Sequence, residues 1–143
     1  YDKLSNEKIF IEVKRLPIVD FEDPPKKKLK GLFQKSEYQR CSVFPDGSTS
    51  NKKDGCISIR AYQHLEELLK VVKLGNRGIL VMIALRNDTY GFYPNYINDK
   101  KYTNKFYEVL ENGVEIQGYK MNYNTKGVRF GGNLPLIPKD KLL

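Results

Sequence analysis

The chain has 143 residues, about the length of one domain with a single core. Its 25 lysines and arginines outnumber its 17 acidic residues, and the resulting net charge of +8 favours an anionic partner over an acidic protein or a neutral metabolite. Charge alone does not separate nucleic acid from an anionic membrane surface. No apolar run approaches the roughly 20 residues that cross a bilayer, and the first residues lack the order of a signal peptide. We therefore expect a soluble, intracellular protein with no membrane partner.

The cysteine and histidine content excludes two kinds of site. Cys41, Cys56 and His64 are too few for a disulfide framework or for a four-ligand zinc site. The sequence starts at Tyr1 rather than at a methionine. We therefore expect a fragment, a processed form or part of something longer.

The first predicted element is a strand within residues 8–19, a stretch rich in Ile, Val and Phe that is broken or ended near Pro17. Alternation along this strand places Glu12 and Lys14 on one face, with the apolar residues between and beside them on the other. A Glu-x-Lys pair of this kind, with an aspartate from a neighbouring strand, is the arrangement that a metal-dependent phosphodiesterase uses. Asp2 is the only aspartate upstream. The alternative is an ordinary exposed charge pair on an edge strand.

Residues 20–56 have the character of a long basic insertion with turn and loop signals, and with one short helix or strand around residues 33–43. Phe33 and Tyr38 lie between basic residues and could stack on unpaired bases. The alternative is a solvated, flexible loop. The basic residues that we expect to bind nucleic acid here are Lys26, Lys27, Lys28, Lys30, Lys35 and Arg40.

Five further elements follow in the sequence. Helical periodicity predicts a helix over residues 60–74, with Ser58 as N-cap and Gly75 at its end, and a second helix over residues 99–112. The apolar run at residues 78–85 predicts a central strand buried on both faces. Residues 114–121 predict another strand, and the turn at 124–127 predicts a hairpin. This order is typical of an α/β layered domain, in which the tyrosines from Tyr90 to Tyr123 are interpreted as packing residues because they are spread over several elements.

Several segments of the sequence carry a family resemblance: Arg60-Ala61-Tyr62-Gln63-His64-Leu65-Glu66-Glu67-Leu68, Arg86-Asn87-Asp88, Phe92-Tyr93-Pro94, Ile97-Asn98-Asp99, Leu110-Glu111-Asn112-Gly113-Val114-Glu115-Ile116, Tyr119 and Leu134-Pro135. Together they resemble the C-terminal half of the sugar fermentation stimulation protein family, SfsA. The similarity covers about half of the chain, and Glu12-Val13-Lys14 stands where that family has its Glu-Val-Lys strand. The resemblance implies a single α/β domain over residues 1–143 with a restriction-endonuclease-like (PD-(D/E)xK) mixed sheet flanked by helices. The OB-like domain that precedes this half in the family has no counterpart here.

The chain departs from the family pattern between the Glu-Val-Lys strand and the first helix. Phe44-Pro45-Asp46-Gly47 keeps the residues of a family segment but stands further than usual before His64, whereas Asp54-Gly55 has nearly the right spacing without the Phe-Pro. Either aspartate could correspond to the family residue. The aspartate expected before the motif strand falls at Asp2.

The resemblance implies a specific chemistry. Asp2 and Glu12 would hold Mg²⁺ or Mn²⁺ through hard oxygen ligands. Lys14 would orient the attacking water or stabilise negative charge in the transition state. His64 could act as a general base or contact nucleic acid, although a solvated or helix-packing role on its helix is equally available. Arg60, one turn before it, could contact phosphate, whereas an arginine at a helix start is more often simply solvated.

Three functional hypotheses remain open. The first is a metal-dependent nuclease that acts on DNA or RNA through Asp2, Glu12 and Lys14. The second is a nucleic-acid-binding module that does not cleave and that uses the basic insertion for phosphate contacts. The third is a structural component of a larger chain or assembly, such as a ribonucleoprotein.

Overall fold

A computed structural model describes residues 7–20, 40–46, 56 and 58–142. The predictions made for Asp2, for Asp54 and for the lysines and aromatic residues of 21–39 lie outside these residues. The described elements are β1 (Ile9–Leu16), β2 (Ile18–Val19), β3 (Cys41–Phe44), α2 (Ile59–Lys73), β4 (Arg77–Ala84), β5 (Gly91–Pro94), α3 (Lys100–Glu111), β6 (Glu115–Asn124), β7 (Gly127–Asn133) and a short 3₁₀ helix, Lys139–Lys141.

The main sheet is mixed and has the strand order β1-β4-β6-β7. β1, β4 and β6 are parallel, and β7 returns antiparallel to β6 as the predicted hairpin. The prediction that the apolar strand lies centrally is confirmed, since β4 pairs with β1 on one side and β6 on the other. β1 is therefore an edge strand of this sheet.

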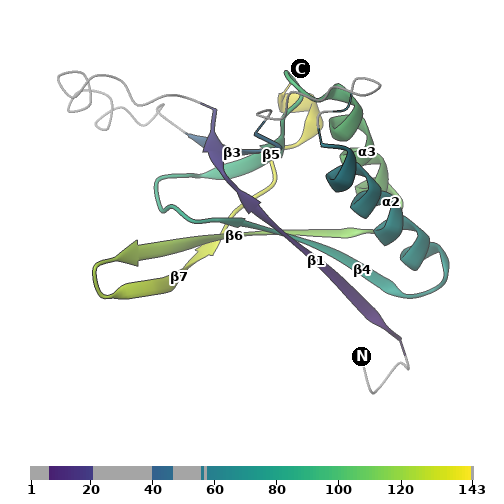
Figure 1. The fold of residues 1–143 in the computed structure, drawn as a ribbon, viewed down its shortest axis with the longest axis horizontal. Helices are drawn as coiled ribbons and strands as arrows, with labels where there is room; N and C mark the ends of the chain where they lie inside the picture. Colours follow the sequence, from purple (N-terminus) through teal and green to yellow (C-terminus); the bar gives the residue numbers. More distant parts are fainter. Residues whose placement is uncertain (1–6, 21–39, 47–55, 57, 143) are drawn as a thin grey trace.

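A second, smaller sheet was not predicted from the sequence. Its order is β2-β3-β5, and it lies beyond the carboxyl end of β1 (Figure 1). β3 overlaps only the end of the short element expected around residues 33–43, most of which lies outside the described residues. β3 pairs in parallel with β5, about 50 residues later in the chain.

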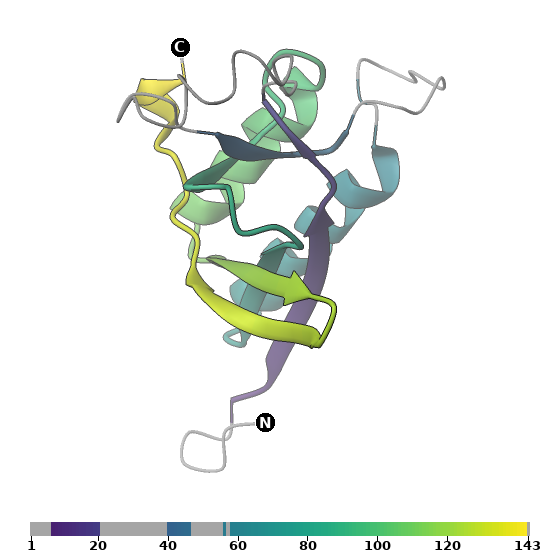
Figure 2. The same ribbon diagram turned by 90° about the vertical axis from the view of Figure 1, so that its left-hand side faces the viewer.

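The two helices pack against each other on one side of the main sheet, as the two views together show (Figures 1 and 2). Leu65 and Leu68 of α2 meet Leu80 and Met82 of β4 in the core. The opposite face of β4 is more open than predicted, because Val81 and other residues there are only partly covered by the described chain. Among the described residues, no helix is long and apolar enough to cross a bilayer.

Both predicted helix ends are confirmed at the level of the backbone. Ser58 is the N-cap of α2, although its side chain makes no capping hydrogen bond. Gly75 follows the C-cap of the same helix in the left-handed conformation, with φ of 78°. Asp99 caps α3, because its carboxylate accepts a hydrogen bond from the backbone N–H of Tyr102.

Gly118 of β6 lies where the chain end returns to the sheet. A Cβ atom at this position would be 2.2 Å from the carbonyl oxygen of Leu134 and 2.3 Å from the ring of Phe92. We expect Gly118→Ala to lower the free energy of unfolding by about 2 kcal/mol, since both neighbours are buried and must move. Urea unfolding followed by circular dichroism measures this loss. Asn133→Ala on the exposed neighbouring strand is the control, and equal stability of the two variants would contradict the close approach.

Candidate functional site

The candidate site lies on the edge strand β1, where its helix-facing side meets α2. The exposure pattern confirms the predicted alternation: Glu12 and Lys14 are partly covered, whereas Ile11 and Val13 are 60% and 55% exposed on the other face. α2 places His64 beside the charged pair. The structure thus brings together three predicted residues from segments about 50 positions apart.

Glu12 is the centre of this group. Its Oε1 atom lies 2.6 Å from the Lys14 Nζ and 2.5 Å from the His64 Nδ1. Lys14 Nζ also lies 2.9 Å from His64 Nδ1. Glu12, Lys14 and His64 therefore form a closed triangle of polar atoms, which we call the edge triad.

The short distances of His64 Nδ1 to Glu12 and to Lys14 cannot both be hydrogen bonds at the same time. His64 Nδ1 either carries a hydrogen and donates it to Glu12, or is bare and accepts one from Lys14. In both patterns the Lys14 ammonium donates to the Glu12 carboxylate. The ionised carboxylate is thus always compensated by at least one donor.

The electrostatics of the edge triad keep Glu12 ionised. Partial burial raises the pKa of Glu12, but hydrogen bonds and charge from Lys14 and His64 outweigh burial and leave the pKa below its ordinary value. A carboxylate with a lowered pKa remains an anionic oxygen donor at neutral pH. Such a group can hold a divalent cation or accept a proton from a bound hydroxyl group.

A hollow of about 170 Å³ opens between β1 and α2 beside Glu12 and His64. Glu67 also lines it, one helical turn after His64. Glu67 was not among the predicted site residues, although its spacing of three residues from His64 on a helix was a usable signal.

Within the described parts of the chain, no three His, Cys, Asp or Glu side chains are grouped so that they could hold a metal ion. Asp46 is described and exposed, in the loop after β3. Arg60 is exposed in the first turn of α2. The roles expected for both stay predictions.

Tyr102 is a second residue near the edge triad that sequence reasoning did not assign to a site. Its hydroxyl group is buried and has no hydrogen-bond partner among the described residues. Burial raises the pKa of Tyr102, and the charges of Asp99, Cys56 and Glu12 add to this effect. The sequence grouped Tyr102 with the packing tyrosines, and its burial agrees with that interpretation, but no sequence signal indicated that its hydroxyl group lies close enough to Glu12 for the two to interact.

Arg40, expected to bind nucleic acid, has a different environment from the one predicted. Its side chain is only 3% exposed, and its guanidinium lies 2.8 Å from Asp88. Asp88 also accepts two hydrogen bonds from Arg86, at 2.6 and 2.7 Å. The geometry favours a structural role for Arg40 in holding Asp88, because a buried guanidinium cannot reach a phosphate on the surface.

The Arg40–Asp88–Arg86 group predicts an acid-dependent loss of stability. Hydrogen bonds from Arg86, with the charges of Arg86 and Arg40, outweigh burial and lower the pKa of Asp88 below its ordinary value of 3.8. A lowered folded-state pKa means that the stabilisation is fully present above the ordinary value and is lost as the pH falls through the folded-state pKa. We expect Asp88→Asn to lower the free energy of unfolding by about 2 kcal/mol at neutral pH, and by progressively less below about pH 4. Urea unfolding at a series of pH values measures this, with Asp140→Asn, at an exposed position, as control. A cost that stays constant down to pH 2 would contradict it.

Comparison with known proteins identifies the family. Residues 28–127 match the family model described as "Sugar fermentation stimulation protein RE domain". The chain belongs to the sugar fermentation stimulation protein family. The predicted resemblance is thereby confirmed, although the matched residues begin after the Glu12-Val13-Lys14 strand.

Similar family members occur in bacteria and archaea. A homologue from Lawsonia intracellularis is 34% identical over 67% of this chain, and one from Sulfolobus acidocaldarius is 35% identical over 52%. These alignments cover 33% and 29% of the two relatives, so the chain spans only about a third of the length of these SfsA homologues.

A solved structure extends the comparison to almost all of the chain. The structure of Pyrococcus furiosus SfsA in complex with Ca²⁺ superposes with a TM-score of 0.67 and 23% identity. The match covers 94% of this chain and 47% of the Pyrococcus protein. At this identity the likeness shows the fold: a mixed sheet with two helices, as in SfsA.

Proposed function

We propose that this SfsA-family chain is a nucleic-acid-binding protein with a nuclease-like site that hydrolyses phosphodiester bonds of DNA or RNA with Mg²⁺ or Mn²⁺. The observation that carries the proposal is the edge triad, in which an ionised carboxylate, an ammonium group and an imidazole converge on one exposed edge of the sheet. The fold that we assign to it is the restriction-endonuclease-like PD-(D/E)xK arrangement. The net charge of +8 supports an anionic substrate.

The residues of the edge triad fit a divalent cation in part. Glu12 supplies anionic oxygen, which Mg²⁺ and Mn²⁺ prefer, and its lowered pKa keeps it ionised. The described residues alone do not complete a ligand set. We assign the second carboxylate to Asp2, outside the described residues, and the Ca²⁺ in the Pyrococcus structure supports a divalent cation in this fold. When bound, such an ion supplies an activated water and compensates charge on the phosphate.

The chain's own residues then have distinct roles. Lys14 lies on the same face as Glu12 and can donate hydrogen bonds to a phosphate oxygen, which stabilises the charge that builds up during hydrolysis. His64 holds Glu12 in place through Nδ1, and its Nε2 is the ring atom left to exchange a proton. Arg60 and the lysines of the 20–56 insertion remain candidates for nucleic-acid contacts, whereas the buried Arg40 holds Asp88 and is not proposed as a contact.

Incubation with labelled DNA and RNA tests the proposal. We expect cleavage with Mg²⁺ or Mn²⁺, none with chelator, and loss of cleavage in both Glu12→Ala and Lys14→Ala. Glu111→Ala, at the exposed end of α3, is the control. Cleavage that survives both substitutions at the edge triad would exclude this site.

The alternative is a module that binds nucleic acid without cutting it, by itself or inside a larger assembly. The net charge of +8 supports this reading as well, because phosphate contacts by lysine and arginine need no metal ligands. It predicts binding that weakens steeply with salt while no product forms under any metal condition.

A further inference from the structure

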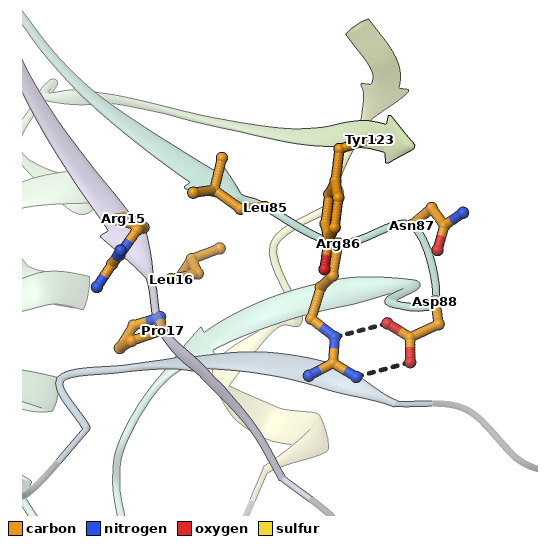
Figure 3. A pocket seen from close by; sticks show the side chains of 8 residues that line it. All are labelled: Arg15, Leu16, Pro17, Leu85, Arg86, Asn87, Asp88 and Tyr123. Carbon is orange, nitrogen blue, oxygen red and sulfur yellow. Dashed lines mark hydrogen bonds and ion pairs between the residues drawn. The ribbon is translucent and has the colours of Figure 1, made fainter. Parts of the chain in front are cut away.

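A second site lies at the carboxyl ends of the parallel strands β1 and β4. A pocket of about 630 Å³ opens there, within the range of small-molecule sites. Figure 3 shows its walls: Arg15 and Pro17 from β1 and the residue after it, Leu85 and Asp88 from the loop that follows β4, and Tyr123 from β6. Ligands of open parallel sheets commonly bind at this edge.

The pocket carries a surplus of positive charge. Two arginines, Arg15 and Arg86, line it against one carboxylate, Asp88. Asp88 already forms ion pairs with Arg86 and with the buried Arg40. Arg15 is exposed and has no ion-pair partner within the described residues. Its guanidinium is therefore the group best placed to receive a phosphate.

The pocket also offers an aromatic surface. Tyr123 lines the pocket and is 63% exposed, so much of its ring is open to a ligand. The register shift between Lys120 and Met121 bends the hairpin strand before Tyr123. Leu85 is likewise exposed on the pocket wall. A planar ring can stack with its apolar face on the tyrosine ring while polar groups at its edge face Asn87.

The pocket adjoins the edge triad through β1. Arg15 directly follows Lys14, and alternation sends the two side chains to opposite faces of the same edge strand. A polynucleotide that passes round this edge can place one phosphate at Lys14 and a neighbouring nucleotide in the pocket. Such a nucleotide must be unstacked from its neighbours, which a single strand allows at little cost.

We infer that this pocket binds an unpaired nucleotide beside the cleaved bond, with its base on Tyr123 and its phosphate on Arg15, so that the substrate is single-stranded nucleic acid. This inference rests on the proposed function, because it concerns the strand that the edge triad would cut. A free nucleoside phosphate has the same chemistry as the nucleotide within a strand, and the experiment separates the two.

Binding is measured by fluorescence anisotropy with the whole chain in chelator, so that no step depends on a metal. The probes are single-stranded DNA and RNA of roughly eight nucleotides, the same strand without bases, a duplex, and free nucleoside monophosphates as competitors. The variants are Tyr123→Ala, Tyr123→Phe and Arg15→Ala. Lys73→Ala, at the opposite end of the sheet, removes the same charge as Arg15→Ala and serves as control. Circular dichroism verifies that each variant is folded.

We expect Tyr123→Ala to weaken single-strand binding by about fivefold or more, with Tyr123→Phe close to the original chain. Arg15→Ala should lower affinity for all strands and reduce the salt slope by about one. The original chain should bind the strand without bases about as weakly as Tyr123→Ala binds the strand with bases. Lys73→Ala should have little effect on affinity. Duplex binding as tight as single-strand binding, equal affinity for free monophosphates, or no effect of Tyr123→Ala would overturn the inference. Absence of cleavage with this binding pattern intact would count against the nuclease site alone.

Discussion

Cleavage is expected to fall by at least about a hundredfold when Glu12 is replaced by glutamine, because the variant keeps the shape of the side chain and loses its negative charge. In the edge triad, Lys14 and His64 both lie against Glu12 Oε1. The neutral amide oxygen still accepts a hydrogen bond from one of them. We therefore expect the free energy of unfolding to change by only about 1 kcal/mol. Single-turnover cleavage with saturating Mg²⁺ measures the first effect and urea unfolding the second.

The matched control is Glu111→Gln, which makes the same chemical change at an exposed position near the end of α3. It should leave both cleavage and stability unchanged. A Glu12→Gln variant that retains full cleavage would show that the carboxylate charge takes no part in the reaction. A variant that fails to fold would contradict the expected small change in stability, and in that case Lys14→Met provides the second test of the same site.

Local sequence patterns were sufficient for the elements that determine the main sheet. The alternation around Glu12, the helical spacing of the leucines in α2 and the apolar run of β4 each act over a few neighbouring residues. They identified the face on which Glu12 and Lys14 lie, and the central place of β4. Periodicity predicts that α2 packs on the sheet, but it does not predict where along the strands the helix lies. The contact between His64 and Glu12 depends on that position and was therefore not predicted.

The missed features depend on contacts between residues far apart in the chain. β2 and β5 have two and four residues, too few for a periodic signal, and they are held by pairing with β3. The Arg40–Asp88 pair joins residues 48 positions apart, so Arg40 was grouped with the basic insertion beside it in sequence. Tyr123 was interpreted as a packing residue, but it is exposed near the end of β6, where only the hairpin partner β7 pairs with it. In each case topology, rather than composition, determined the environment.

Loss of the Asp99 carboxylate is expected to give the largest change in stability. Asp99 is fully buried, and its Oδ1 accepts a hydrogen bond of 2.9 Å from the backbone N–H of Tyr102 at the start of α3. Its Oδ2 accepts one of 3.2 Å from the backbone N–H of Ser58, the N-cap of α2. One side chain thus ties the first turns of both helices together. Asp99→Ala removes the cap and leaves two N–H groups without this acceptor, so we expect a loss of about 3 kcal/mol.

Thermal unfolding should show this loss as a decrease in Tm of roughly 6–12 °C for a chain of this size. Asp99→Asn keeps one acceptor oxygen and should lose less, and Asn98→Ala, at the exposed neighbouring residue, should change little. The Cys56 thiol gives a local readout: burial and the charge of Asp99 both raise its pKa. Removing Asp99 lowers that pKa and loosens the junction, so Cys56 should react faster with a thiol reagent in Asp99→Ala than in Asn98→Ala. Equal reaction rates together with an unchanged Tm would mean that the helix junction does not depend on Asp99. The edge triad needs α2 to be held against β1, and in that case the leucine core alone would position the helix.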